Sequence, residues 1–472
     1  MSLAKLSVIN ANKKYINGDF SAVEMVNECI SNVEKYKEKN AVIEVFSDVL
    51  DLAKALDEKR ANGEKLGKLA GVVVTIKDNI LYNGKKATAS SNFMKNFVAT
   101  YTATALQKII DEDAIILGRT NMDEFTLGSN GESSIYGASE NAIKEGRIAG
   151  GSSGGSAVAV ALDMCAFSLA SDTGGSARKP AIYNGVCGVK PTYGMVSRHG
   201  LYTNSASFDQ IAPITKTAED LAYVLSIISG NDPFDMTTTT EKEMDFSQEK
   251  LYSFSGVTFG VEKSLIEKCI NSSVYPEFNK LLDFIKQNGG EIKEIEIDNI
   301  LLAKDVYDLI SCSEIASGFA RYDGLKYTTQ TESPKNVSEL YKKSRKEGFG
   351  SEVIKRIMLG NYVLSQNKVY HKAKDVQQVL INGAKEAFSN VDALILPTAI
   401  MVAPKKGEVC SEEEALLNVI ANVMQIPSVS IPFAFDNENM PYGVSIFGDK
   451  GKDGFIINLA RFIEENYVGG DR

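Results

Sequence analysis

Two stretches rich in glycine and serine, "GGSSGGS" at 150–156 and "DTGGS" at 172–176, flank one short apolar segment. A serine hydroxyl can attack a carbonyl carbon when a nearby base takes its proton, and unobstructed backbone N–H groups can stabilise the oxyanion that forms. Glycines leave such N–H groups unobstructed, so this composition indicates serines presented to one point in space. The alternative is that the glycines only mark turns around a buried helix.

Familiar histidine and phosphate chemistry does not account for these stretches. "GSSGG" at 151–155 matches G-x-S-x-G with Ser153 as nucleophile, but that arrangement needs a histidine base late in the chain. The sequence has two histidines, His199 and His371, and neither lies in a context that marks it as a base. A phosphate-binding loop requires a lysine after the glycines, and none follows here.

Lys77 is the candidate base. It ends "GVVVTIK", a run typical of a strand buried on both faces, so its amine would leave the sheet at the carboxyl end of a strand. A lysine is neutral near pH 7 only when burial or nearby positive charge lowers its pKa by several units. The alternative interpretation is a surface lysine at a strand end.

Three motifs in the order "GVVVTIKDNI", "GGSSGGSA" and "SDTGGSARKPA" resemble the amidase signature family. The resemblance implies that Ser176 is the nucleophile, that Lys77 is the base, and that Ser152, in a cis peptide with Gly151, relays the proton. The remaining residues that it implies are the oxyanion-hole donors Thr173, Gly174 and Gly175 and the supporting residues Ser153, Asp172 and Arg178.

Later stretches, among them "GRTNMDEFTLGS", "SFDQIAPIT" and "RIMLGNY", resemble one branch of that family, the glutamine-hydrolysing A subunits of tRNA-dependent amidotransferases. In that branch an arginine grips the α-carboxylate of glutamine, and the matching residue here is Arg356, with Tyr307 expected in the same pocket. The acidic residue expected for the α-amino group is replaced by Ala415. The sequence departs at two further places: Lys179 replaces a glutamine, and the acidic residues nearest to Ala415 are Glu412, Glu413 and Glu414.

The resemblance implies a cytoplasmic enzyme that hydrolyses glutamine and supplies ammonia for amidation of Glu-tRNA(Gln) or Asp-tRNA(Asn). It implies a heterotrimer with the B and C subunits as partners, and tRNA would be contacted mainly through the B subunit. ATP and magnesium would be used by the partner, and this chain would need no cofactor. Two alternatives stay open, a free-standing amidase acting on another carboxamide and an inactive scaffold protein within a heteromeric assembly.

The composition, 44% hydrophobic and 24% charged with a net charge of −10, is that of a globular protein. No basic stripe occurs, so we expect this chain alone to bind tRNA poorly. The six cysteines are scattered without metal-ligand spacing, so we expect no metal and reduced, mostly buried thiols. The longest apolar stretch, 157–170, is too short to cross a bilayer, and the first residues lack a secretory-signal pattern.

The elements that must position these residues alternate between strands and helices. Residues 71–76 and 114–118 are short apolar runs typical of buried strands, and "TATALQKIIDED" between them has helical periodicity. This order predicts parallel pairing. Because the alternation returns after residue 256, we predict an α/β fold, a large mixed, mostly parallel central sheet covered by helices on both faces.

Local signals also predict where helices begin. Ser21 and Glu24 have the spacing of a capping box, and Thr120 or Asn121 could cap a second helix. We predict a single domain over 1–472, with a helical segment at 1–60, a catalytic core at 65–230, and the remaining sheet and substrate-pocket half at 251–472.

Overall fold

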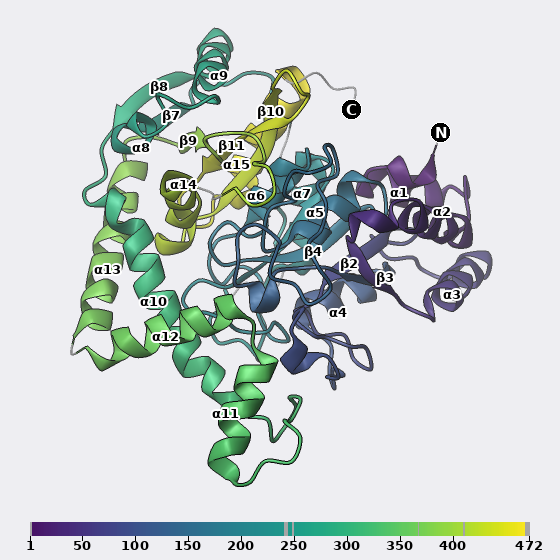
Figure 1. Ribbon diagram of the computed structural model, residues 1–472. Helices are drawn as coiled ribbons and strands as arrows, with labels where there is room; N and C mark the ends of the chain where they lie inside the picture. The colour runs from purple at the N-terminus through teal and green to yellow at the C-terminus, as the bar shows by residue number, and fades with distance from the viewer. Residues whose placement is uncertain (1, 240–243, 248–249, 367, 409–410, 468–472) are drawn as a thin grey trace.

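The computed structural model describes residues 2–239, 244–247, 250–366, 368–408 and 411–467, and within them eleven strands form one sheet (Figure 1). In their order across the sheet, the strands are β1 (Val42–Val45), β3 (Ile115–Thr120), β2 (Val73–Lys77), β4 (Phe167–Asp172), β6 (Gln210–Thr215), β5 (Cys187–Lys190), β10 (Ser428–Phe435), β11 (Pro441–Phe447), β9 (Ala393–Pro397), β7 (Thr258–Glu262) and β8 (Glu291–Ile295).

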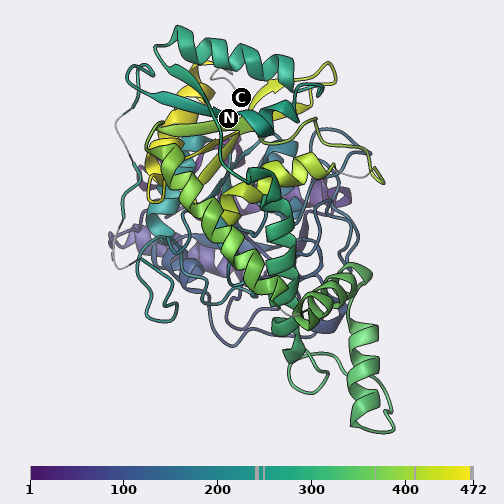
Figure 2. The ribbon, with the colours of Figure 1, turned by 90° about the vertical axis from the view of Figure 1, so that its left-hand side faces the viewer.

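Fifteen α-helices accompany the sheet within the same residues, and Figure 2 shows α11 at the end of an arm that projects from the body. In chain order, they are α1 (Val8–Ile16), α2 (Ala22–Lys35), α3 (Val49–Ala61), α4 (Thr104–Asp111), α5 (Gly154–Ala161), α6 (Arg178–Tyr183), α7 (Ala218–Ile228), α8 (Lys263–Glu267), α9 (Tyr275–Gln287), α10 (Ala303–Gly318), α11 (Val337–Gly348), α12 (Ser351–Ser365), α13 (Val369–Phe388), α14 (Glu412–Val423) and α15 (Asp453–Asn466).

The sheet is mixed, as predicted, but the prediction that it is mostly parallel is wrong. Six of its ten neighbouring pairs are antiparallel. The parallel pairs join β2 to β3 and β4, and β7 to β8 and β9. Continuous apolar runs indicate that a strand is covered on both faces, but they do not determine its direction. A short turn between β10 and β11, for example, reverses the chain and requires antiparallel pairing.

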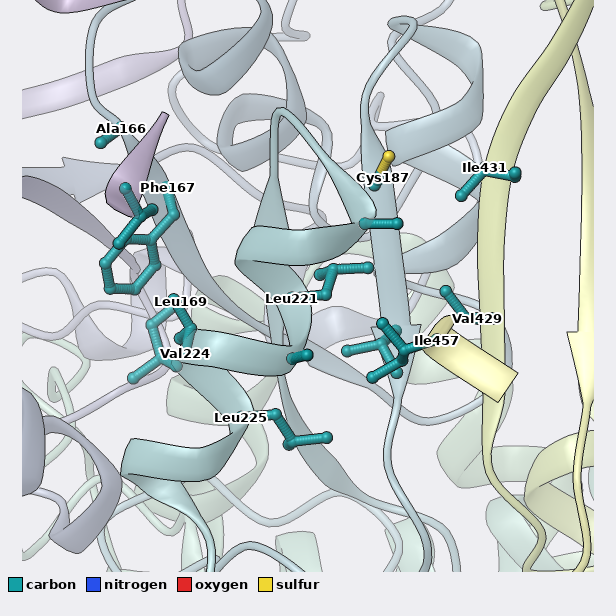
Figure 3. Packing of buried hydrophobic residues seen from close by; sticks show 14 of the residues in the cluster. Ala166, Phe167, Leu169, Cys187, Leu221, Val224, Leu225, Val429, Ile431 and Ile457 are labelled. Carbon is teal, nitrogen blue, oxygen red and sulfur yellow. The ribbon is translucent and has the colours of Figure 1, made fainter. Parts of the chain in front are cut away.

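Helices cover both faces of the sheet, as predicted. Side chains alternate between faces along a strand, so Gly188 and Val189 of β5 point in opposite directions. Gly188 faces α6, where an added Cβ would lie 3.0 Å from the Cβ of Ala181. Val189 belongs to the large apolar cluster on the other face, which contains side chains of α7 and α15. Figure 3 shows part of this cluster, with α7 lying over strands of the central sheet.

The start of α2 confirms the capping box, because Ser21 and Glu24 each bond the other's backbone N–H. The segment at 1–60 is not wholly helical, because β1 pairs with β3 at the edge of the sheet. The helix expected after β3 is also absent from the described residues. Asn121 donates its side-chain N–H to the carbonyls of Asn40 and Gly137 rather than capping a helix, and a short 3₁₀ turn follows at Glu124–Thr126.

Five cysteines are described, and all five are free and buried, as predicted; they are Cys29, Cys165, Cys187, Cys269 and Cys312, and Cys410 lies outside the described residues. In the described ranges, no group of three or more His, Cys, Asp or Glu side chains is placed to hold a metal ion. Nor is any helix in that part of the chain long and apolar enough to cross a membrane.

Candidate active site

The two glycine- and serine-rich stretches meet beside the carboxyl ends of β2 and β4. These strands are parallel neighbours, so Lys77 at the end of β2 and Asp172 at the end of β4 emerge at the same edge. Ser152 and Ser153 lie directly before α5, and the N–H of Ser153 donates to the carbonyl of Ser176 at 3.1 Å. The chain therefore returns to one point after passing through α5 and β4, as the spacing predicted.

Lys77 is completely buried, and its Nζ lies among hydroxyl groups. It is 2.8 Å from Oγ of Ser152, 2.7 Å from Oγ of Ser153 and 3.0 Å from Oγ of Ser171. The structure thus joins Lys77 to the two predicted serines of the first stretch. Ser171 was not anticipated, although it lies in the quoted "SDTGGS" motif.

Burial lowers the pKa of Lys77 to about 7, whereas three nearby carboxylates, those of Asp123, Asp172 and Asp209, raise it. Of the two causes considered from the sequence, burial therefore operates, and the nearby charges oppose it. A lysine with this pKa is substantially neutral at physiological pH and can accept a proton.

The peptide bond between Gly151 and Ser152 is cis, as the family resemblance implies. Asp123 supports this segment, because its backbone N–H donates to the carbonyl of Ser152 at 3.1 Å. The Asp123 carboxylate in turn accepts the N–H groups of Gly131 and Ser133. Asp123 was missed as a site residue, although it belongs to the "GRTNMDEFTLGS" motif.

Ser176 is 7% exposed and lies in the turn before α6. The relay also needs a hydrogen bond between the hydroxyls of Ser176 and Ser152, and this bond is not among those of the described residues. In free enzymes, catalytic hydrogen bonds are often long and tighten only with substrate.

A buried ion pair holds the turn that carries Ser176, as predicted for Asp172 and Arg178. Their side chains are fully buried, with Nε of Arg178 3.1 Å from Oδ2 of Asp172. Burial alone would raise the pKa of the Asp172 carboxyl, but Arg178 and hydrogen bonds hold it well below its usual range. Breaking this pair would leave an uncompensated charge inside the protein.

The Asp172 carboxylate also changes the predicted oxyanion hole. The N–H of Gly175 donates to Oδ1 of Asp172 at 2.9 Å, so this group is not directed toward a substrate as expected. Gly175 has a φ of +101°, and this left-handed conformation wraps the turn around the carboxylate. Of the three predicted donors, Thr173 and Gly174 remain.

Tyr307 of α10 lies against this turn, because a Cβ at Gly174 would be 2.8 Å from Cζ of its ring. Only glycine permits this approach. Thr173 is also held, since its hydroxyl donates to Oδ1 of Asp209 at 2.8 Å. Burial raises the pKa of Asp209 to about 6. Asp209 was not anticipated, although "SFDQIAPIT" was quoted for the resemblance.

Arg356 of α12 is partly exposed and already contacts two carboxylates. Its Nε donates to Glu352 at 2.9 Å, and its Nη1 lies 3.4 Å from Oδ1 of Asp308, the residue after Tyr307. Asp308 also pairs with Lys304. The structure therefore brings Arg356 and Tyr307 to neighbouring helices, in a cluster that holds both charges.

The glutamates before Ala415 have other surroundings. Glu414 is buried, accepts the hydroxyl of Tyr183 at 2.7 Å and pairs with Lys179 at 3.3 Å. The side chain of Glu412 is 86% exposed and lies 3.8 Å from Lys304. Glu414 is thus occupied within the protein, whereas Glu412 is turned largely to solvent.

Comparisons with known proteins agree with this arrangement. The family model described as Amidase matches residues 24–457. A protein of Fusobacterium nucleatum, named as the A subunit of glutamyl-tRNA(Gln) amidotransferase, is 36% identical over 98% of this chain and 97% of its own length. The crystal structure of a protein of the same name from Thermotoga maritima has a TM-score of 0.82 and 32% identity, covering 99% of this chain and 96% of that one.

A further crystal structure, titled as that of an amidase, has a TM-score of 0.85 and 27% identity, covering 98% of this chain and all of that one. The sequence and structural matches therefore extend through the strands and loops that bring Lys77, Ser152 and Ser176 together, and this chain belongs to the amidase family.

Proposed function

We propose that this chain is the glutamine-hydrolysing component of a tRNA-dependent amidotransferase. The observation that carries the proposal is the buried Nζ of Lys77, 2.8 Å from Oγ of Ser152, at the point where the Ser176 turn meets that serine. The names of the relatives supply the substrate class, since they are called the A subunit of glutamyl-tRNA(Gln) amidotransferase.

In the first half-reaction, Oγ of Ser176 attacks the side-chain amide carbon of glutamine. The proton of Ser176 passes to Ser152, whose own proton passes to Lys77. The N–H groups of Thr173 and Gly174 stabilise the oxyanion. When the carbon–nitrogen bond breaks, the proton returns along the same path to the leaving nitrogen, and ammonia departs.

In the second half-reaction, water attacks the acyl-enzyme ester. Lys77 takes the proton of water through Ser152 and returns it to Oγ of Ser176, so glutamate is released and the enzyme is restored. Asp172, Arg178 and Ser153 hold the turn and the lysine, and they exchange no proton with the substrate.

Arg356 and Asp308 are the groups that fit the two charges of an α-amino acid. A guanidinium suits the α-carboxylate, and a carboxylate beside it suits the α-ammonium. Asp308 takes the role for which Ala415 has no acidic group, since Glu414 is engaged with Lys179 and Tyr183. Tyr307 forms the wall between this pair of charges and the Ser176 turn.

The relatives' names also support partner proteins, the B and C subunits, which would receive the ammonia and bind tRNA mainly through the B subunit. Such partners would use ATP and magnesium, and the complex would work in the cytoplasm on Glu-tRNA(Gln) or Asp-tRNA(Asn). The acidic chain, with a net charge of −10, is suited to leaving tRNA contacts to another protein of the complex.

A substrate series tests the proposal. Glutamine should be hydrolysed faster than glutaramate, which lacks the α-amino group, and faster than 4-aminobutanamide, which lacks the α-carboxylate. Acetamide, which lacks both, should be the poorest substrate. The rates should be compared for the purified chain and again with candidate partner subunits present. Equal rates on all four amides would contradict the glutaminase and favour a free-standing amidase, the alternative that Ala415 supports.

A further inference from the structure

The proposed triad uses one of the three hydroxyls that contact Lys77 and leaves two without a role in proton transfer. Ser153 and Ser171 are both fully or nearly fully buried, and they lie 2.7 Å and 3.0 Å from Nζ. Ser171 has a second partner, because Nδ2 of Asn79 donates to its Oγ at 3.0 Å. Asn79 follows β2 and Ser171 lies in β4, so this contact joins the two strands that hold the site.

Counting donors and acceptors separates the three hydroxyls. An ammonium has three N–H donors, so in its charged form Lys77 can donate to all three serines. A neutral amine has two N–H donors and one lone pair, so one hydroxyl must then donate to the amine. Ser153 is unsuited to this, because its hydroxyl donates to the carbonyl of Ser171 at 3.2 Å.

Ser171 is also engaged as an acceptor. N–H groups of Asn79 and Lys77 both point at its Oγ, and a hydroxyl oxygen has two acceptor sites. Ser152 is therefore the hydroxyl left to face the lone pair of Lys77.

We infer that Ser171, oriented by Asn79, is a positioning residue that keeps an N–H of Lys77 and so directs the lone pair of the amine to Ser152 and sets the pH at which Lys77 becomes a base. The inference rests on the proposed role of Lys77. The charged groups that face Lys77 are Asp123 after β3, Asp172 at the end of β4 and Asp209 before β6, and they stay unchanged in every variant below.

The pH dependence of Ser176 labelling by an alkyl fluorophosphonate tests this inference without a choice of amide substrate. In that reaction Oγ of Ser176 bonds to phosphorus, fluoride leaves, and the serine proton passes through Ser152 to Lys77. Ser171→Ala removes an acceptor from the ammonium, which disfavours the charged form, so the rise of labelling rate with pH should move about one unit lower. Asn79→Asp adds a negative charge that favours the ammonium, so the rise should move about one unit higher.

Matched variants separate this effect from damage to the fold. Ser171→Thr keeps the hydroxyl and should restore the wild-type pH profile. Ser168→Ala removes another buried hydroxyl of β4, one bonded only to the Thr75 carbonyl among the described residues, and should leave the profile in place. If Ser171→Ala fails to fold, the near-isosteric Asn79→Asp still gives the opposite shift.

The outcomes are distinct. Opposite shifts in the two variants, with both matched variants unshifted, support the inference. Profiles of Ser171→Ala and Asn79→Asp that coincide with the wild type would overturn it while leaving the proposed function intact. A wild-type chain that is not labelled at Ser176 would overturn the proposed function and the inference together.

Discussion

The site contains two buried or partly buried cations that the protein treats in opposite ways. Lys77 has three neutral hydroxyls within 3.0 Å, and burial lowers its pKa to about 7. Arg356 lies in a partly exposed cluster and contacts the carboxylates of Glu352 and Asp308. A cation surrounded by hydroxyls without solvent can give up its proton, whereas a cation paired with carboxylates keeps its charge. The first environment suits a base, and the second suits recognition of a charged ligand.

Replacing Lys77 should have the largest effect. Lys77→Ala removes the base, and Lys77→Arg substitutes a group that stays protonated, so both should reduce glutamine hydrolysis by about a thousandfold or more. Steady-state ammonia release measures this, with thermal unfolding as a check on the fold. A Lys77→Arg enzyme with a near-normal rate would contradict the assignment of the base.

The Asp172–Arg178 pair tests what happens when a buried charge loses its partner. Arg178→Met leaves the Asp172 carboxylate buried and unpaired, so the free energy of unfolding should fall by about 3–5 kcal/mol. Urea unfolding followed by circular dichroism measures the change. Asp172→Asn combined with Arg178→Met should recover part of the loss, and an undiminished stability in Arg178→Met would mean that the pair is not needed.

Arg356→Ala should remove selectivity for the α-carboxylate while sparing the chemistry. We expect kcat/KM to fall about a hundredfold for glutamine and glutaramate, because a charged hydrogen-bonding partner is lost. The value for 4-aminobutanamide, which has no carboxylate, should change little. An equal fall for all three amides would place Arg356 in a structural role.

Asp308→Asn should give the complementary pattern with a smaller effect, because Asp308 also pairs with Lys304 and Arg356. We expect about a tenfold fall for glutamine and 4-aminobutanamide, and little change for glutaramate. The ratio of glutamine to glutaramate kcat/KM reports the difference directly. If that ratio keeps its wild-type value, Asp308 does not bind the ammonium.

The pH dependence of the wild type should show the smallest effect within the usual working range. Lys77 must be neutral to accept a proton, and its pKa is lowered to about 7. The value of kcat/KM should therefore rise with pH, about tenfold per unit below pH 7, and level off above it. A profile that is flat between pH 5.5 and pH 8, roughly the range over which a base with that pKa titrates, would show that no such base limits the reaction.

Much of the catalytic half follows from local sequence. The run before Lys77 predicts a buried strand, and Ser21 with Glu24 predicts a helix start, because side-chain periodicity and capping depend on residues a few positions apart. The glycines around Ser152 and Ser176 likewise indicate their tight turns. Their assignment to one mechanism came from the family resemblance, which covers motifs and not distances.

Tertiary structure decided what depends on segments far apart in the chain. Strand directions, the carboxylate that takes the N–H of Gly175, and the pairing of Asp308 with Arg356 all differ from the sequence-based picture or were absent from it. The division of the chain near residues 230–250 stays a prediction. Local propensities determine which residues form a strand or a turn, but only packing determines which side chains share a desolvated space, and desolvation is what makes Lys77 a base.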